Sequence, residues 1–143
     1  MNKILATVLA LATANTLSAQ TTCSTQVVGT GCGAQLDVTF TPVGASGNHD
    51  ITVDVSGMNP AGLGLMAWGQ TALNVPLFGC NVYTDFLWGL TVHPDANGNW
   101  SWGRAWPASA IGFFRIQVAT LELDPMGSLV VELTDCVLAE CVQ

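Results

Sequence analysis

Apolar and polar residues alternate along much of this chain, and the alternation constrains the fold more than any other feature of the sequence. A period of two places successive side chains on opposite faces of a β-strand. Such a strand buries one face in a core and exposes the other to solvent. The clearest examples are the apolar sets Leu36, Val38, Phe40 and Ile51, Val53, Val55.

Clusters of glycine, proline and asparagine separate the alternating segments, as at residues 42–48, 57–62 and 95–98. Short strands divided by such turn clusters are typical of a β-sandwich. For residues 35–143 we predict an all-β, Ig-like or Greek-key sandwich of about eight or nine antiparallel strands. Residues 63–68 are apolar on both parities, so a strand buried on both faces is expected there.

The N-terminal residues predict export. A short positive segment, Met1–Lys3, precedes the apolar run Ile4–Ala14, and the small residue Ala19 follows. This pattern is typical of a bacterial Sec-type signal peptide, here residues 1–19, cleaved after Ala19. The apolar run is shorter than the roughly 18 residues that cross a membrane as a helix. We expect a protein that is secreted or held at the cell surface, with residues 20–34 as a polar, cysteine-containing lead-in.

Charge is scarce and mostly negative. Only 9% of the residues are charged, against roughly 25% in an ordinary domain. The formal net charge is −7, and Arg104 and Arg115 are the only cations after Lys3. Nucleic acids and anionic lipid surfaces need clustered Lys and Arg, so neither is an expected partner. The carboxylates are scattered and no G-x-S-x-G motif is present, so we predict a protein that is not an enzyme.

The chain has five cysteines, all after residue 19: Cys23, Cys32, Cys80, Cys136 and Cys141. Their spacing matches no zinc module and contains no C-x-x-C. In an exported protein, disulfides are therefore expected. The odd number leaves at least one thiol unpaired or bridged to another molecule.

Four short motifs occur in a fixed order: GTGCG at 29–33, FGC at 78–80, DANG at 95–98 and VATLELDP at 118–125. This order resembles the uncharacterised secreted β-sandwich domain of the planctomycete type, over roughly residues 29–138. The resemblance implies a sandwich fold and a Cys32–Cys80 disulfide, and it implies no chemistry. Cys23, Cys136 and Cys141 depart from the family's pattern. They suggest a second bridge from Cys23 to Cys136 or Cys141, with one cysteine left over.

Three tryptophans, Trp100, Trp102 and Trp106, share one strand face with Arg104. They could form a flat platform for sugar rings, fill the core, or contact another protein. The resembled family carries aliphatic residues at these positions, which favours the core. A buried, unpaired arginine is unfavourable. Either the face opens at Arg104, or Arg104 pairs with a carboxylate such as Asp85 or Glu122.

Asp95, Asn97 and Asn99 place side-chain oxygens at alternate positions, as a calcium loop does. The acidic ligand that completes an EF-hand loop is missing downstream, and the same residues suit a hairpin turn. A turn is favoured, calcium is the alternative, and no other cofactor is expected. The two histidines, His49 and His93, are expected to be solvated turn residues.

Low charge, many strands and an odd cysteine favour a non-enzymatic structural or interaction module. Self-assembly into a surface filament or layer is one form of this function, because uncharged strand edges can pair with other chains. Its partners would be copies of itself or other extracellular proteins. The alternative is a carbohydrate-binding module that binds polysaccharide on the Trp100, Trp102 and Trp106 face.

Overall fold

The polar–apolar alternation produces strands throughout residues 21–143, the part of the chain that the computed structural model describes. The predicted signal peptide, residues 1–19, lies outside the described residues. Within residues 21–143 no helix is long and apolar enough to cross a membrane. The strands are β1 (Thr22–Gly29), β2 (Gln35–Val43), β3 (Asn48–Ser56), β4 (Leu63–Gly69), β5 (Ala72–Leu77), β6 (Cys80–Thr84), β7 (Trp88–Val92), β8 (Trp100–Trp106), β9 (Gly112–Leu123), β10 (Leu129–Leu133) and β11 (Cys136–Val142).

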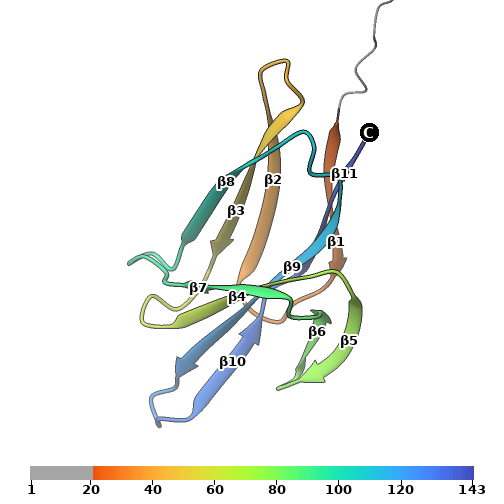
Figure 1. The fold of residues 1–143 in the computed structure, drawn as a ribbon. Helices are drawn as coiled ribbons and strands as arrows, with labels where there is room; N and C mark the ends of the chain where they lie inside the picture. Colours follow the sequence, from red (N-terminus) through yellow and green to blue (C-terminus); the bar gives the residue numbers. More distant parts are fainter. Residues whose placement is uncertain (1–20) are drawn as a thin grey trace, which may run out of the picture.

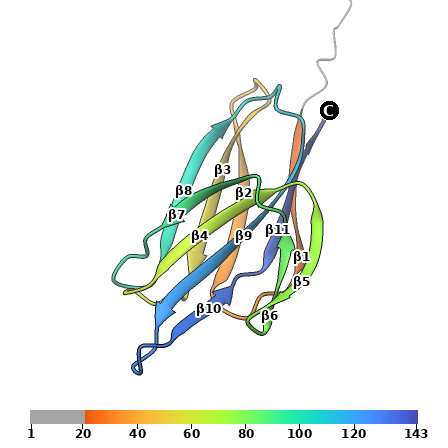
Figure 2. The same ribbon diagram turned by 60° about the horizontal axis from the view of Figure 1, so that its bottom comes forward.

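The strands form three antiparallel sheets. The large sheet has the order β1-β11-β9-β4-β7, with β10 also paired to β9. The small sheet has the order β2-β3-β8, and β5 and β6 form a separate hairpin. The chain crosses between the large and small sheets after β1, β3, β7 and β8, so neither sheet is formed by one continuous segment of the chain. Figures 1 and 2 show the small sheet against the large one, with the β5-β6 hairpin at one side.

The core lies between the two sheets. Buried side chains of β2 and β3 in the small sheet meet buried side chains of the large sheet in one apolar cluster. The large-sheet members are Met66, Val92, Ile116, Val118 and Val137. The alternating residues predicted to be buried in β2 and β3 belong to this cluster, Phe40 at its partly buried margin. The all-β, antiparallel prediction is thus confirmed.

The expected number of strands, eight or nine, is too low. Residues 20–34 were expected to be a lead-in, yet Thr22–Gly29 forms β1 and pairs with β11 at the edge of the large sheet. Four of the eight β1 residues are polar and exposed, and none of the eight is fully buried. The strand therefore lacks the alternating buried residues by which a strand is recognised in a sequence. Backbone pairing with β11 and the disulfide between Cys23 and Cys141 hold it instead.

The prediction that residues 63–68 are buried on both faces is wrong. Gly64 and Met66 face the core, but Leu63 and Leu65 are 41% and 38% exposed. Within the described part of the chain no layer covers this part of the outer face, because the β5-β6 hairpin packs farther along β9. The large sheet therefore presents leucines to solvent.

Gln117 of β9 ties three parts of the fold together. Its side chain is 3% exposed. Its Oε1 accepts the backbone N–H of Tyr83 at 2.9 Å, and its Nε2 donates to the carbonyls of Asn81 and Thr134, both at 3.0 Å. A buried amide with all these partners stabilises the structure, whereas the loss of one partner leaves a buried polar group without a hydrogen bond, which is destabilising. Gln117 thereby fixes β6 and the β10-β11 junction to the centre of β9.

Two disulfides close long loops. The structure joins Cys32 to Cys80, the pair that the family resemblance implies, and Cys23 to Cys141, one of the two partners considered for Cys23. Cys23 and Cys141 face each other in the register of β1 and β11. In the chain-entropy model, each bond contributes roughly 4–5 kcal/mol. Two such bonds fit folding in an oxidising environment.

The remaining cysteine, Cys136, is buried with 0% exposure at the start of β11. Burial raises the pKa of its thiol to about 11. Since the thiolate is the reactive form, this cysteine is not poised to bridge another molecule. The odd cysteine therefore gives no support to a disulfide-linked assembly.

We predict that Cys136 does not react with a thiol reagent at pH 8 in the native protein. At that pH the thiol is protonated and shielded, whereas the unfolded chain exposes an ordinary thiol. Colorimetric thiol titration, without reductant, should detect a slow or absent reaction in buffer and one thiol per chain in guanidinium. Rapid stoichiometric labelling of the native protein would contradict this assignment.

The matched variants Cys136→Ala and Cys136→Ser test the apolar character of the site. The free energy of unfolding of the serine variant should be about 1–3 kcal/mol lower than that of the alanine variant, because serine buries a hydroxyl without a hydrogen-bond partner. Urea unfolding of both variants measures this difference. Equal stability would show that the site accepts a polar group.

Candidate functional site

The three tryptophans of β8 lie on the face directed at the core. Trp100, Trp102 and Trp106 are each half-buried and pack against the core cluster. Their strand forms one edge of the small sheet, so no further strand among the described residues covers their outer margin. The rings are thus part of the core, and they also retain solvent-accessible edges.

A cleft of about 400 Å³ opens where β8 faces the ends of β4, β7 and β9. The two sheets supply opposite walls, because β8 belongs to the small sheet and the other three strands to the large sheet. Four of the five tryptophans in the chain line this cleft. The aromatic lining is Trp68, Trp88, Trp102, Trp106 and Phe114.

Trp68 is the centre of the aromatic packing. Its ring centroid lies 4.6 Å from that of Phe114, 5.5 Å from that of Trp102 and 5.7 Å from that of Trp88. Phe114 in turn contacts Trp106 at 5.0 Å. Each such pair contributes about 0.5–1.5 kcal/mol beyond area burial. The contacts hold the walls of the cleft in place.

The indole N–H groups of two cleft tryptophans differ in their partners. Trp106 Nε1 donates to the carbonyl of Ala110 at 2.8 Å, which fixes the ring to the loop between β8 and β9. Trp68 Nε1 is buried and has no hydrogen-bond partner among the described residues. A buried donor without a partner is destabilising by about 1–3 kcal/mol. The unpartnered N–H of Trp68 thus lowers the stability of the fold, and local costs of this kind are common at functional sites.

Arg104 lies between Trp102 and Trp106 on β8, and the face opens at this point. Arg104 is exposed and lines the cleft. The carboxylate of Asp85, one of the partners considered for it, is directed elsewhere. Asp85 Oδ1 accepts the amides of Gln70 and Thr71 at 2.7 and 2.8 Å, and Oδ2 accepts the Thr71 hydroxyl at 3.0 Å.

These hydrogen bonds of Asp85 hold one rim of the cleft. The amide of Thr71, followed by its hydroxyl and the amide of Gln70, lowers the pKa of the Asp85 carboxyl. On the other side of the same turn, Arg115 Nη1 donates to the carbonyl of Gln70 at 3.2 Å. Gly69 and Gln70, which line the cleft, are thus held from both sides.

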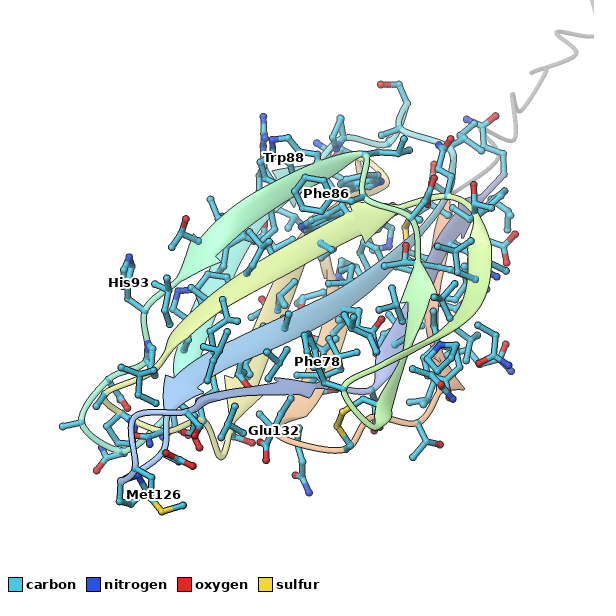
Figure 3. All side chains as sticks on the ribbon, turned by 90° about the horizontal axis from the view of Figure 1, so that it is seen from below. Phe78, Phe86, Trp88, His93, Met126 and Glu132 are labelled. Atoms are coloured by element: carbon cyan, nitrogen blue, oxygen red, sulfur yellow. A yellow bond between two sulfur atoms is a disulfide. The ribbon has the colours of Figure 1, made fainter. Side chains whose placement is uncertain are left out.

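The adjoining part of the rim, which pairs with the end of β4, is apolar and exposed. Phe86, Leu87 and Trp88 precede or begin β7 and are 60%, 64% and 47% exposed. The ring of Phe86 lies against Gly89, where a Cβ would overlap it. Figure 3 shows Phe86 and Trp88 close together at one end of β7, with His93 at the other end.

The Asp95 segment forms a turn. Asp95 Oδ1 accepts the amides of Asn97 and Asn99 at 2.8 and 2.9 Å, and these bonds, that of Asn99 most, lower the pKa of the carboxyl. Gly98 has a φ of +76°, and a Cβ there would overlap the carbonyl oxygen of Met58. Calcium binding by Asp95, Asn97 and Asn99 stays a prediction. Residues 21–143 contain no group of three or more His, Cys, Asp or Glu side chains that could hold a metal ion.

The two histidines do not meet. His49 pairs with Trp106 at one end of β3, while His93 lies in a second cleft with Trp100 near the other end. His93 is exposed, as expected for a turn residue. His49 is buried beside the ring of Phe40, centroid to centroid 6.2 Å, and its Nδ1 lies 3.1 Å from the carbonyl oxygen of Gly47. The expectation of a solvated His49 is therefore wrong.

The sequence predicts that the β8 tryptophans and Arg104 share a face, but it does not predict the facing wall of Trp68, Trp88 and Phe114. Trp68 lies in a run interpreted as buried on both faces, and the sequence assigns no site to Trp88. Phe114 belongs to the regular alternation of β9, and nothing in the sequence distinguishes it from a core residue. The number of tryptophans, five in this short chain, was the available sign that aromatic residues from several strands converge.

Trp68 and Trp88, which are in contact, provide a matched pair of substitutions for testing how each ring contributes to stability. Trp68→Ala should lower the free energy of unfolding by about 3 kcal/mol or more, because it removes the central ring and leaves a cavity. Trp88→Ala, at an exposed position, should cost about 1 kcal/mol or less. Trp68→Phe should cost less than Trp68→Ala, because it keeps a ring and removes the unpartnered N–H. Chemical denaturation measures all three; equal losses at positions 68 and 88 would contradict this packing order.

Comparison of the chain with protein-family models, with curated proteins and with solved structures finds no match. The planctomycete-type resemblance stays a prediction.

Proposed function

We propose that the protein is an exported, non-enzymatic binding module that holds a polysaccharide in the aromatic cleft. The observation that carries this proposal is the convergence of four tryptophans and Phe114, from both sheets, on one open cleft. Ligand sites are concave and mainly apolar, with a few polar groups that orient the ligand. Indole faces suit the flat apolar faces of sugar rings, while Arg104 and Gln70 supply polar contacts at the rim.

The composition of the cleft also favours binding over hydrolysis. Its lining, within the described residues, contains no Asp, Glu, His or Cys. Glycosidases require two carboxyl groups placed on either side of the scissile bond. A bound polysaccharide would therefore meet aromatic rings and one guanidinium, without a general acid or nucleophile beside it.

Trp88→Ala tests polysaccharide binding. Because Trp88 is exposed, its removal should leave the fold intact and weaken binding by about tenfold or more, the loss expected when a stacking ring is deleted. Calorimetry or affinity electrophoresis against a panel of soluble polysaccharides provides the measurement. Trp100→Phe, at a tryptophan outside the cleft, is the control and should bind as the wild type does. If no polymer binds, or if Trp88→Ala binds normally, the proposal fails.

Self-assembly is a second candidate, supported by the outer face of the large sheet. Leu63 and Leu65 of β4 lie beside Leu121 and Ala119 of β9, and Leu123 pairs with Leu129 of β10. Leu123 and Leu129 are 69% and 61% exposed. Contiguous apolar surface of this kind marks interaction sites. With only two cations after Lys3, ion pairs between copies are scarce, so association would depend on this leucine face.

Sedimentation over a wide concentration range tests assembly. The wild type should show concentration-dependent association, and Leu65→Glu or Leu129→Glu should abolish it, because a charge on the leucine face cannot be desolvated. Thr25→Glu, on the exposed side of β1, is the control and should associate as the wild type does. A wild-type protein that stays monomeric at millimolar concentration would contradict self-assembly.

A further inference from the structure

Both cations of residues 21–143 lie at the aromatic cleft. Arg104 lines it directly, and the guanidinium of Arg115 donates to the carbonyl of Gln70, another lining residue. None of the ten carboxylates of the chain belongs to the lining, and Asp85, which holds the rim, has both oxygens bonded to Gln70 and Thr71. In a protein with a net charge of −7, this cleft combines positive charge with an absence of lining carboxylates.

From this charge distribution we infer that the ligand of the cleft is an acidic polysaccharide, whose carboxylate or sulfate groups pair with Arg104. The inference rests on the proposed function and specifies its ligand. Arg104 lies between Trp102 and Trp106 on the same strand face, roughly 7 Å from each along the strand. A sugar stacked on either ring brings a charged substituent within reach of the guanidinium.

A neutral polymer fits this arrangement less well. Covering Arg104 with a neutral chain removes water from a charged group without a compensating charge, which is unfavourable. An anionic substituent replaces that water by a charge-assisted and often bidentate hydrogen bond. The cation therefore favours acidic over neutral sugars, while the aromatic rings contribute to the binding of both.

The second cleft provides an internal contrast. It is lined by Asp54, Asp95, His93 and Trp100, near the opposite end of β8 from Trp106. An aromatic ring is present there, but the charged neighbours are carboxylates. An acidic polymer is repelled at that position, so the selectivity for acidic sugars should belong to Arg104 and the aromatic cleft alone.

Matched polymers test the inference on the full protein. Polygalacturonate is compared with its fully methyl-esterified form, and a sulfated galactan with its desulfated form. At least one acidic polymer should bind about tenfold tighter than its neutral counterpart, as a charge-assisted hydrogen bond predicts, and added salt should reduce the difference. The arm that shows the difference identifies the anion as carboxylate or sulfate.

Arg104→Gln should reduce binding of the acidic polymer to the level of its neutral counterpart, and Arg104→Lys should retain part of the difference. Gln26→Glu, which makes the same change in net charge on exposed β1, should leave the difference intact. Circular dichroism verifies that each variant is folded.

Three results would overturn the inference. Equal binding of acidic and neutral polymers overturns it and leaves the proposed function intact. A preference for acidic over neutral polymer that persists in Arg104→Gln also overturns the inference and leaves the proposed function intact, because the anionic group must then bind away from Arg104. Absence of binding to every polymer overturns both the inference and the proposed function.

Discussion

The fold depends on β9 and on the buried amide of Gln117 at its centre. β9 pairs with β4 along one edge and with β11 and β10 along the other. Gln117 satisfies backbone groups of β6 and of the β10-β11 junction, and so couples the hairpin and both neighbouring strands to one point. Phe114, three residues earlier on the same strand, forms part of the aromatic cleft. The network that secures the sheet thus also positions one wall of the site.

The cleft stays open because its large rings meet at the edges of both sheets. β8 and β7 are edge strands, so no further strand of residues 21–143 covers the outer margins of Trp88, Trp102 and Trp106. The rings pack on one another through Trp68 and Phe114 at the partly buried margin of the core. A site that is rigid before binding loses little conformational entropy when a ligand arrives.

The sequence predicted what depends on local alternation and failed where distant strands determine the result. The buried sets of β2 and β3 and the shared face of Trp100, Trp102 and Trp106 follow from a period of two. β1 was missed because its stability comes from backbone pairing with β11, which leaves no apolar pattern. Burial of Leu63 and Leu65 was wrongly expected, because which part of a sheet is covered depends on where the β5-β6 hairpin packs. The meeting of Trp68 with Trp102 likewise depends on strand order, which no single segment encodes.

The two candidate functions use opposite faces of β4 and are therefore compatible. Met66 and Trp68 face inward, the latter at the aromatic cleft, whereas Leu63 and Leu65 face outward on the leucine face. A polysaccharide offers many equivalent sites along one chain. Copies joined through their leucine faces would present several clefts at once, and a linked second binding event gains strength from its high effective concentration. Assembly would thus strengthen weak single-site binding without any new contact to sugar, so the polymer affinity of this protein should rise with its degree of association.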